Sequence, residues 1–182
     1  LIPLSWSPSG DKLAIYRRMP PTDSARTLFP RQLCILDRTG VLQQCMEDNL
    51  PMHGVGFPQG WGYYYPVTWS PGGQNIYFDT EYPDTESFSG YGRRLVEASV
   101  VTGETLRILH EYPESFSISL SPDMNHVALE SGDDWYGLGF PAYMLDLTTG
   151  IQIDIPDLMP EVVGLYHLYS FSPQGSYYVV GA

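Results

Sequence analysis

The sequence has little positive charge. Its 182 residues include only nine Lys and Arg against 21 Asp and Glu, which gives a formal net charge of -12. A protein that binds nucleic-acid phosphates or an anionic membrane surface needs clustered positive charge, so this balance argues against both partners. An acidic surface is compatible with a cationic partner, with cation binding or simply with solubility.

Long apolar runs are also missing. No stretch approaches the ~20 apolar residues that a bilayer-spanning helix needs. No signal peptide is recognisable, and the N-terminus at Leu1 is interpreted as a cut edge or a mature end. The hydrophobic content of 43% nevertheless predicts a globular fold, and the 18 Gly and 16 Pro favour many short strands and turns.

The common catalytic signatures are absent. The sequence contains no G-x-S-x-G nucleophile motif, no P-loop and no H-E-x-x-H zinc motif. His110 and Glu111 begin such a zinc motif, but Glu114 stands where its second histidine is required. His126 and His167 lie on or beside expected strands, where a hydrogen-bonded structural role is expected. We therefore expect no enzymatic activity, cofactor or metal in this segment, although a catalytic domain outside it would escape this search.

A Ser-Pro motif occurs four times. The segments 4–10 (LSWSPSG), 67–73 (VTWSPGG), 118–124 (ISLSPDM) and 169–175 (YSFSPQG) align without gaps, and the prolines are 63, 51 and 51 positions apart. A short β-rich run follows each motif. Proline cannot continue a strand, and the small or polar residues after it favour a turn. Each unit is therefore predicted to start as strand, tight turn and strand.

A second signal follows in three of the units. Thr-Gly pairs at 39–40, 102–103 and 149–150 each lie between two β-like stretches. Glycine there supplies the positive φ that a hairpin turn or bulge needs. Four strands in about 50 residues is the period of a propeller blade. A β-sandwich of hairpins is the alternative, but it does not require a repeated motif.

The predicted fold is all-β, a β-propeller of four-stranded antiparallel blades with about three and a half blades present. We expect one propeller segment over residues 1–182, with blade 1 at 1–46, blade 2 at 64–110, blade 3 at 115–156 and the start of blade 4 at 166–182. A partial ring leaves open sheet edges, which are a liability for a soluble monomer. We therefore expect the ring to be completed by the rest of a longer chain, or by a second copy or another chain.

The pattern W-S-P-x-G-x-x-I-A-[YF], followed by a Y-x-x-D-x-x-T-G turn, resembles the TolB-type, WD40-like (PD40) propeller repeat. The third unit departs from it, with Leu120 for the aromatic residue and Met124 for the turn glycine, but it keeps Ser121, Pro122 and Asp123. The resemblance implies an extracytoplasmic bacterial setting: periplasmic, secreted or on the cell surface. It specifies fold far more than function, because propellers host many unrelated activities.

Blade topology assigns the connections to two faces. The Ser-Pro and Thr-Gly turns share one, which we call the turn face. The longer connections share the other, which we call the loop face; they are expected at 18–31, 80–92, 131–141, 46–64, 110–115 and 156–166. Long loops on a rigid scaffold commonly carry binding sites. The candidate binding residues are the acidic and aromatic ones of this face: Trp61, Tyr63, Tyr64, Tyr82, Asp84, Glu86, Tyr91, Asp133, Asp134, Trp135 and Tyr136.

An acidic and aromatic face can stack sugars, cage a cation or dock a basic peptide. The leading hypothesis is a non-catalytic scaffold that binds a protein or glycan partner through this face. The alternative is the substrate-gating propeller of a prolyl-oligopeptidase-like serine hydrolase whose catalytic domain lies outside the segment. A metal-dependent or lactonase-like propeller is a third hypothesis. Calcium could use the carboxylates as hard ligands, but the EF-hand spacing is absent. The structural alternative is that the aromatics anchor the loops and the acids are merely solvated.

The only two cysteines, Cys34 and Cys45, flank the first Thr-Gly turn, and two registers are open. If Leu36 lies opposite Val41, the cysteines share a face as a diagonal pair near the limit of disulfide geometry. If the turn contains a bulge and Asp37 lies opposite Val41, the thiols point to opposite faces. A disulfide would lend slight support to an oxidising compartment.

Overall fold

The computed structural model describes residues 2–18, 31–50, 67–83, 91–112, 116–131, 142–154, 167–172 and 178–181. Every regular element in these stretches is a β-strand, so the expectation of an all-β fold is confirmed for them. Within the same stretches there is no helix that could cross a membrane. The chain divides into two compact units, Leu1–Glu111 and Tyr112–Ala182.

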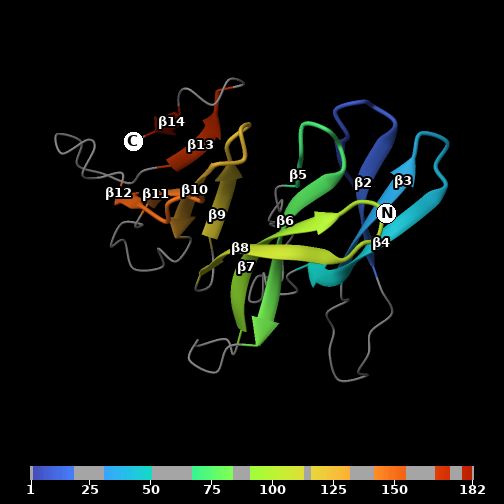
Figure 1. Ribbon diagram of the computed structural model, residues 1–182, viewed down its shortest axis with the longest axis horizontal. Helices are drawn as coiled ribbons and strands as arrows, with labels where there is room; N and C mark the ends of the chain where they lie inside the picture. Colours follow the sequence, from blue (N-terminus) through green and yellow to red (C-terminus); the bar gives the residue numbers. More distant parts are fainter. Residues whose placement is uncertain are drawn as a thin grey trace. The chain divides into compact units, whose positions relative to one another are not determined.

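The first unit holds two four-stranded sheets (Figure 1). Blade 1 consists of β1 (Ile2–Trp6), β2 (Lys12–Arg18), β3 (Arg31–Asp37) and β4 (Leu42–Leu50), and blade 2 consists of β5 (Thr68–Trp69), β6 (Asn75–Pro83), β7 (Tyr91–Ser99) and β8 (Thr105–Tyr112). Each strand pairs with the next along the chain. This is the up-and-down order that the two turn signals predict for a blade.

The second unit repeats this order. Blade 3 consists of β9 (Phe116–Leu120), β10 (His126–Ser131), β11 (Ala142–Asp146) and β12 (Gln152–Asp154), and the start of blade 4 consists of β13 (His167–Phe171) paired with β14 (Tyr178–Gly181). β13 lies beside β9 and β10, so the first strands of the two blades are neighbours. In both β1 and β13 the pairing register shifts just before the aromatic residue of the Ser-Pro motif. The shift lies between Pro3 and Ser5 in β1 and between Leu168 and Ser170 in β13.

Several strands are longer than the sequence predicted. β4 continues to Leu50, so Glu47 and Asp48 belong to a strand and not to a loop. β6 continues to Pro83, and β8 continues to Tyr112. The connection expected at 80–92 is therefore shorter at both ends, and the connections expected at 46–64 and 110–115 begin later than expected. The reason is that strand pairing persists through polar residues once the neighbouring strand is in register, which hydrophobic alternation alone does not reveal.

The Ser-Pro turns owe their recurrence to one set of hydrogen bonds. The serine N–H donates to the C=O of the residue five positions later, and the serine hydroxyl accepts from that residue's N–H. The two distances are 2.9 and 3.1 Å for Ser7 with Lys12, 3.0 and 3.0 Å for Ser70 with Asn75, and 2.8 and 2.9 Å for Ser121 with His126. Since the following proline has no N–H, the serine side chain supplies the polar partner that closes the turn.

The two tight turns of a blade lie together. In blade 2 the Val100 N–H donates to the Gln74 C=O at 2.9 Å, and in blade 3 the Leu147 N–H donates to the Asn125 C=O at 2.7 Å. Each bond joins the Thr-Gly turn to the end of the Ser-Pro turn. The predicted turn face is therefore confirmed in these blades, and the longer connections leave from the opposite end of the strands.

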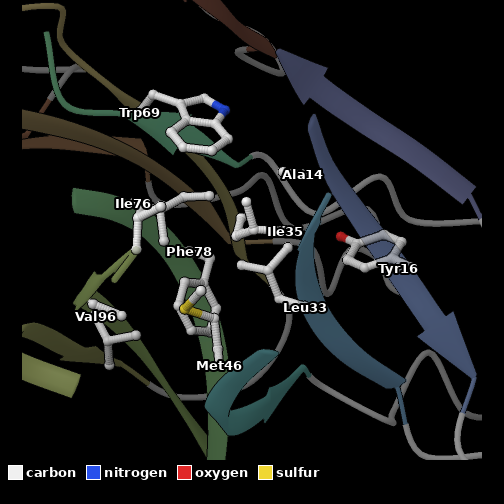
Figure 2. Packing of buried hydrophobic residues seen from close by; sticks show 11 residues of the cluster. Ala14, Tyr16, Leu33, Ile35, Met46, Trp69, Ile76, Phe78 and Val96 are labelled. Atoms are coloured by element: carbon white, nitrogen blue, oxygen red, sulfur yellow. The ribbon is translucent and has the colours of Figure 1, made fainter. Parts of the chain in front are cut away.

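Blades 1 and 2 pack face to face around a hydrophobic core (Figure 2). The core contains Ala14, Tyr16, Leu33, Ile35 and Met46 from blade 1 and Trp69, Ile76, Phe78, Val96, Ala98 and Val100 from blade 2. In β6 and β7 these residues occupy alternate positions, because successive side chains of a strand point to opposite faces. Burial of each large apolar side chain stabilises the fold by about 1.5–3 kcal/mol.

Trp69 closes one end of this core. Its indole Nε1–H donates to the Ser5 hydroxyl at 3.0 Å, and that hydroxyl donates to the Val67 C=O at 3.3 Å. The tryptophan of one Ser-Pro motif is thus held by the serine that precedes the tryptophan of the motif before it. This contact links the first strands of neighbouring blades.

Cys34 and Cys45 form a disulfide within blade 1. At the turn the Asp37 N–H donates to the Val41 C=O, as in the second predicted register. A β-bulge then shifts the pairing of β3 with β4 by one residue, and Cys34 lies directly opposite Cys45. The expectation that this register places the thiols on opposite faces is wrong, because the bulge restores them to one face.

Candidate functional site

The described residues include the strands from which the loop face extends. Of the candidate binding residues, Tyr82 and Tyr91 are placed, and both lie in strands. This corrects the expectation that they belong to a loop. The others lie outside the described residues: Trp61, Tyr63, Tyr64, Asp84, Glu86, Asp133, Asp134, Trp135 and Tyr136.

Tyr82 and Tyr91 stand at the far end of the β6–β7 hairpin. Pro83 pairs with Tyr91, and Tyr82 pairs with Gly92, so these are the last two rows of the ladder. The connection that follows spans residues 84–90 and contains Asp84 and Glu86. The backbone of both residues therefore lies at the base of this connection, in adjacent rows of the ladder.

The Tyr82 ring lies across Gly92. A Cβ atom on residue 92 would overlap ring atoms Cζ and Oη of Tyr82, so only glycine fits there without a shift. The Arg94 guanidinium stands over the ring, 5.9 Å from its centroid, which is within the range of a cation–π contact. Backbone and guanidinium together hold this aromatic side chain in one place.

A buried ion pair lies one step deeper in the same hairpin. The Arg93 guanidinium donates to the Asp79 carboxylate, and both side chains are almost fully enclosed. Charges leave water only at a cost, which an opposite charge in contact offsets. The pair therefore fixes this end of the hairpin.

A polar cluster on blade 2 was not anticipated from the sequence. Glu97 accepts hydrogen bonds from Arg107 Nε at 2.5 Å, from Asn75 Nδ2 at 2.5 Å and from the Tyr77 hydroxyl at 3.1 Å. The cluster crosses β6, β7 and β8. The alternation of side chains in β6 could have indicated it. Asn75 and Tyr77 alternate there with the core residues Ile76 and Phe78, so they share the opposite face of the strand.

The charge state of this cluster is set by its contacts. Burial acts to raise the pKa of Glu97, but the hydrogen bonds from Arg107, Asn75 and Tyr77 outweigh it and hold that pKa below its usual value. Burial, together with the Glu97 charge, raises the pKa of the Tyr77 hydroxyl. Glu97 is therefore ionised and Tyr77 neutral at pH 7, which suits a structural cross-link of three strands.

In the described stretches, no group of three or more His, Cys, Asp or Glu side chains is arranged to hold a metal ion. His110 is half-buried, and burial lowers its pKa, so it is neutral at pH 7. What the hairpin end of blade 2 does provide is a fixed aromatic ring and a guanidinium beside an acidic connection.

No protein-family model and no curated protein sequence matches the chain. Solved structures do match it. TolB from Acinetobacter baumannii matches with a TM-score of 0.52 and 15% identity, over 94% of this chain and 36% of TolB. A putative TolB from Agrobacterium tumefaciens matches with a TM-score of 0.53 and 15% identity, over 98% and 52%. The chain has the fold of a TolB-like β-propeller.

The same propeller fold occurs in larger enzymes. An uncomplexed acylaminoacyl peptidase from Pyrococcus horikoshii matches with a TM-score of 0.54 and 11% identity, over 99% of this chain and 27% of the peptidase. The propeller described here thus spans 36% and 52% of the two TolB chains and 27% of the peptidase. Its fold agrees with the predicted partial ring of four-stranded antiparallel blades.

Proposed function

We propose that this chain is a non-catalytic propeller scaffold that binds a protein or glycan partner through its acidic, aromatic-rich loop face. We further propose that it works as part of a longer extracytoplasmic bacterial protein or assembly. The observation that carries the proposal is the end of the β6–β7 hairpin. Tyr82 packs there against Gly92 and Arg94, and Asp84 and Glu86 follow in the chain.

Preorganisation favours a binding role for this end of the blade. An aromatic ring that is already held in place loses little rotamer freedom when a partner covers it. The buried Asp79–Arg93 pair on the opposite face of the hairpin adds rigidity to the same stretch of backbone. Rigid aromatic anchors surrounded by polar groups are the usual centre of a binding surface.

Charge favours a cationic protein surface over an anionic one. The chain carries a net charge of -12, and Arg93 is engaged by Asp79. Attraction between an acidic face and a basic partner speeds their encounter and weakens as salt is added. A neutral glycan would instead stack on the aromatic rings with little dependence on salt, so the salt dependence separates the two kinds of partner.

The disulfide supports the proposed compartment. Disulfides persist in the periplasm and outside the cell, where thiols are not kept reduced. The Cys34–Cys45 bond would therefore remain intact in an extracytoplasmic protein. The TolB-like fold is in keeping with the same setting.

A pair of charge-matched variants tests the proposal. Asp84→Asn with Glu86→Gln removes two charges from the loop face, and Asp11→Asn with Glu104→Gln removes two from the turn face, where both side chains are exposed. Binding to an array of bacterial envelope proteins and oligosaccharides is measured for both. We expect the loop-face variant to lose at least about tenfold in affinity, a loss of about 1.4 kcal/mol, for the ligand that the wild type binds. Equal binding by both variants would refute the loop face as the site.

A second candidate function is supported by the peptidase comparison. Acylaminoacyl peptidase in complex with Z-Gly-Gly-Phe-chloromethyl ketone matches 99% of this chain and 27% of the peptidase, with a TM-score of 0.55 and 10% identity. In this reading the propeller gates access to a serine hydrolase domain elsewhere in the same protein. A fluorophosphonate probe that labels active serine nucleophiles decides the matter when it is applied to the natural gene product. Covalent labelling supports the gating function, and the absence of labelling supports the scaffold.

A further inference from the structure

The last strand of blade 1, β4, bulges away from its neighbour β3 beside the disulfide. Gln32 of β3 pairs with Asn49 of β4. Two residues further along β3, Cys34 pairs with Cys45, which lies four residues back along β4. One residue of β3 therefore stands opposite three residues of β4, the segment 46–48. Extra residues of this kind bend their strand away from the ladder. Because β4 is the edge strand of its sheet, this segment is available for contact with another blade.

The segment 46–48 docks on blade 2. The Met46 side chain is fully buried in the core that the two blades share (Figure 2). The Glu47 N–H donates to the C=O of Gly103, in the Thr-Gly turn of blade 2, at 2.9 Å. From blade 1 the Gln32 side-chain amide donates to the Met46 C=O at 3.1 Å. The segment thus supplies both a core side chain and a backbone hydrogen bond to the contact between blades 1 and 2.

The disulfide holds the residue that precedes this segment. Cys45 comes directly before it in the chain, and the Cys45 sulfur is bonded to Cys34 of β3. The Cys45 C=O lies so close to Gly103 that a Cβ atom on residue 103 would overlap it. Cys45 is thus tied covalently within blade 1 and packed against a turn of blade 2. Regular pairing of β4 with β3 resumes only beyond the segment. The disulfide is therefore the covalent tie that positions the segment for its contact with blade 2.

The bond is accessible from one side. Cys34 is fully buried, whereas Cys45 is partly exposed on the edge strand. A thiolate from solution therefore reaches Cys45 first, because exchange requires access to the sulfur that is attacked. The two cysteines are only 11 positions apart, and a bond that closes a short loop restricts the unfolded chain less than one that closes a long loop. Both properties favour reduction of this bond in the folded protein.

We propose that Cys45 is a site of thiol–disulfide exchange with a dithiol reductant, and that reduction of the Cys34–Cys45 bond releases the segment 46–48 from blade 2. A thiolate of the reductant attacks the Cys45 sulfur, and the Cys34 sulfur leaves as a thiolate that takes up a proton. The second thiolate of the reductant then attacks its own sulfur in the mixed disulfide and releases Cys45. The protein gains two electrons and two protons, and the reductant leaves with its own disulfide. The bond thus acts as a redox-sensitive latch between blades 1 and 2.

Reduction of the folded protein is the first test. The protein is incubated with millimolar dithiothreitol in the absence of denaturant, quenched with acid and alkylated, and its intact mass is measured. We expect both thiols to be alkylated, and the bond to form again when the reductant is removed, because Ile35 and Gln44 still pair beside the two cysteines. A bond that is reduced only after urea has unfolded the protein would overturn the proposal, since it would then be a structural cross-link alone.

Two single variants identify the sulfur that is attacked. Cys34→Ala leaves Cys45 as the only thiol, and Cys45→Ala leaves Cys34 as the only thiol. Each variant is treated with an aromatic disulfide reagent whose released thiol is followed by absorbance. We expect Cys45 to react several-fold faster than Cys34, because only Cys45 is exposed in part. A Cys34 that reacts as fast as Cys45 would overturn the assignment of Cys45 as the exchange site.

Release of the segment is measured by amide hydrogen exchange. The Glu47 amide is the reporter, because it donates to Gly103 of blade 2. Reduction should speed its exchange by at least about tenfold, whereas the amides of β2, which pairs with a strand on each side, should keep their rates. Equal acceleration in β2 would indicate a general loss of stability and overturn the latch.

A double variant controls for effects of the reductant itself. Cys34→Ala with Cys45→Ala has no bond to reduce, so its Glu47 amide should exchange fast both with and without dithiothreitol. A Glu47 amide that stays protected in this variant would overturn the proposal, because the segment would then remain docked without the bond. None of these results depends on the loop-face variants, so failure of the latch and failure of partner binding are separable.

Discussion

Cys34 in β3 lies directly opposite Cys45 in β4, with their Cα atoms 4.0 Å apart and their sulfurs bonded. The bond ties the third and fourth strands of blade 1 together on the face that points away from the core. A disulfide that closes a loop of this length stabilises a fold by about 2–3 kcal/mol, chiefly by restricting the unfolded chain. Cys34→Ala with Cys45→Ala should therefore lower the free energy of unfolding by that amount, as measured with urea. Intact mass after alkylation, with and without reductant, confirms that the bond is present in the wild type. A double variant as stable as the wild type would contradict the prediction.

Gly103 permits blade 2 to touch blade 1. Its C=O accepts a hydrogen bond from the Glu47 N–H at 2.9 Å, and a Cβ atom on it would overlap the Cys45 carbonyl oxygen. Its φ of 78° is also in the left-handed region. Gly103→Ala should cost roughly 2–5 kcal/mol of stability, because strain and overlap add.

Gly40 provides the matched control for Gly103. It occupies the equivalent turn of blade 1 with a φ of 86°, but a Cβ atom there meets nothing within 4 Å. Gly40→Ala should cost only about 1–2 kcal/mol, the strain of the left-handed conformation. Equal losses for the two variants in urea unfolding would show that the contact between the blades is not tight at Gly103.

Met124 occupies a turn position that the other described Ser-Pro motifs fill with glycine. Its φ is 61°, and its N–H donates to the Ser121 C=O at 3.0 Å. Gly73 makes the same bond to Ser70 with a φ of 66°. A side chain in this conformation is strained, so Met124→Gly should raise the stability of the second unit by about 1 kcal/mol. Urea unfolding measures the gain, and Gly73→Met in blade 2 should show the reverse. A loss on Met124→Gly would indicate that the Met124 side chain stabilises its surroundings by more than the strain costs.

The Glu97 cluster makes stability depend on acid pH. The folded pKa of Glu97 lies below its ordinary value, although burial alone would raise it, because the hydrogen bonds from Arg107, Asn75 and Tyr77 favour the carboxylate. The stabilisation is thus fully present above the unfolded pKa of about 4.3 and is lost as the pH falls through the lower folded value. Glu97→Gln should cost roughly 1.5–3 kcal/mol at pH 7, since charged hydrogen bonds are lost.

Urea unfolding of wild type and Glu97→Gln at a series of pH values between 7 and 3 checks this dependence. The difference between them should be constant near neutrality and should shrink below about pH 4. Arg107→Gln is the comparison, and it should cost less because 61% of the Arg107 side chain is exposed to water. A difference that is independent of pH would show that the charge of Glu97 does not contribute.

The turns were predictable from the sequence because each depends on residues close together in the chain. Ser7, Ser70 and Ser121 close their turns through hydrogen bonds to residues five positions away. The strand positions follow from the same turns, which bound them on one side. The loop ends of the strands were predicted too short, because no local turn signal marks where pairing stops.

The sequence by itself thus determined the blades, their strand order and the turn face, all of which follow from local turn chemistry and from alternation along a strand. Only the tertiary structure decided which residues meet across strands and between blades. The bulge in blade 1 places Cys34 opposite Cys45, and the packing of blade 2 buries Trp69 while its counterpart Trp6 stays half-exposed. Such outcomes depend on register and on which neighbour covers a face, and two copies of one motif therefore differ in their surroundings although their sequences match.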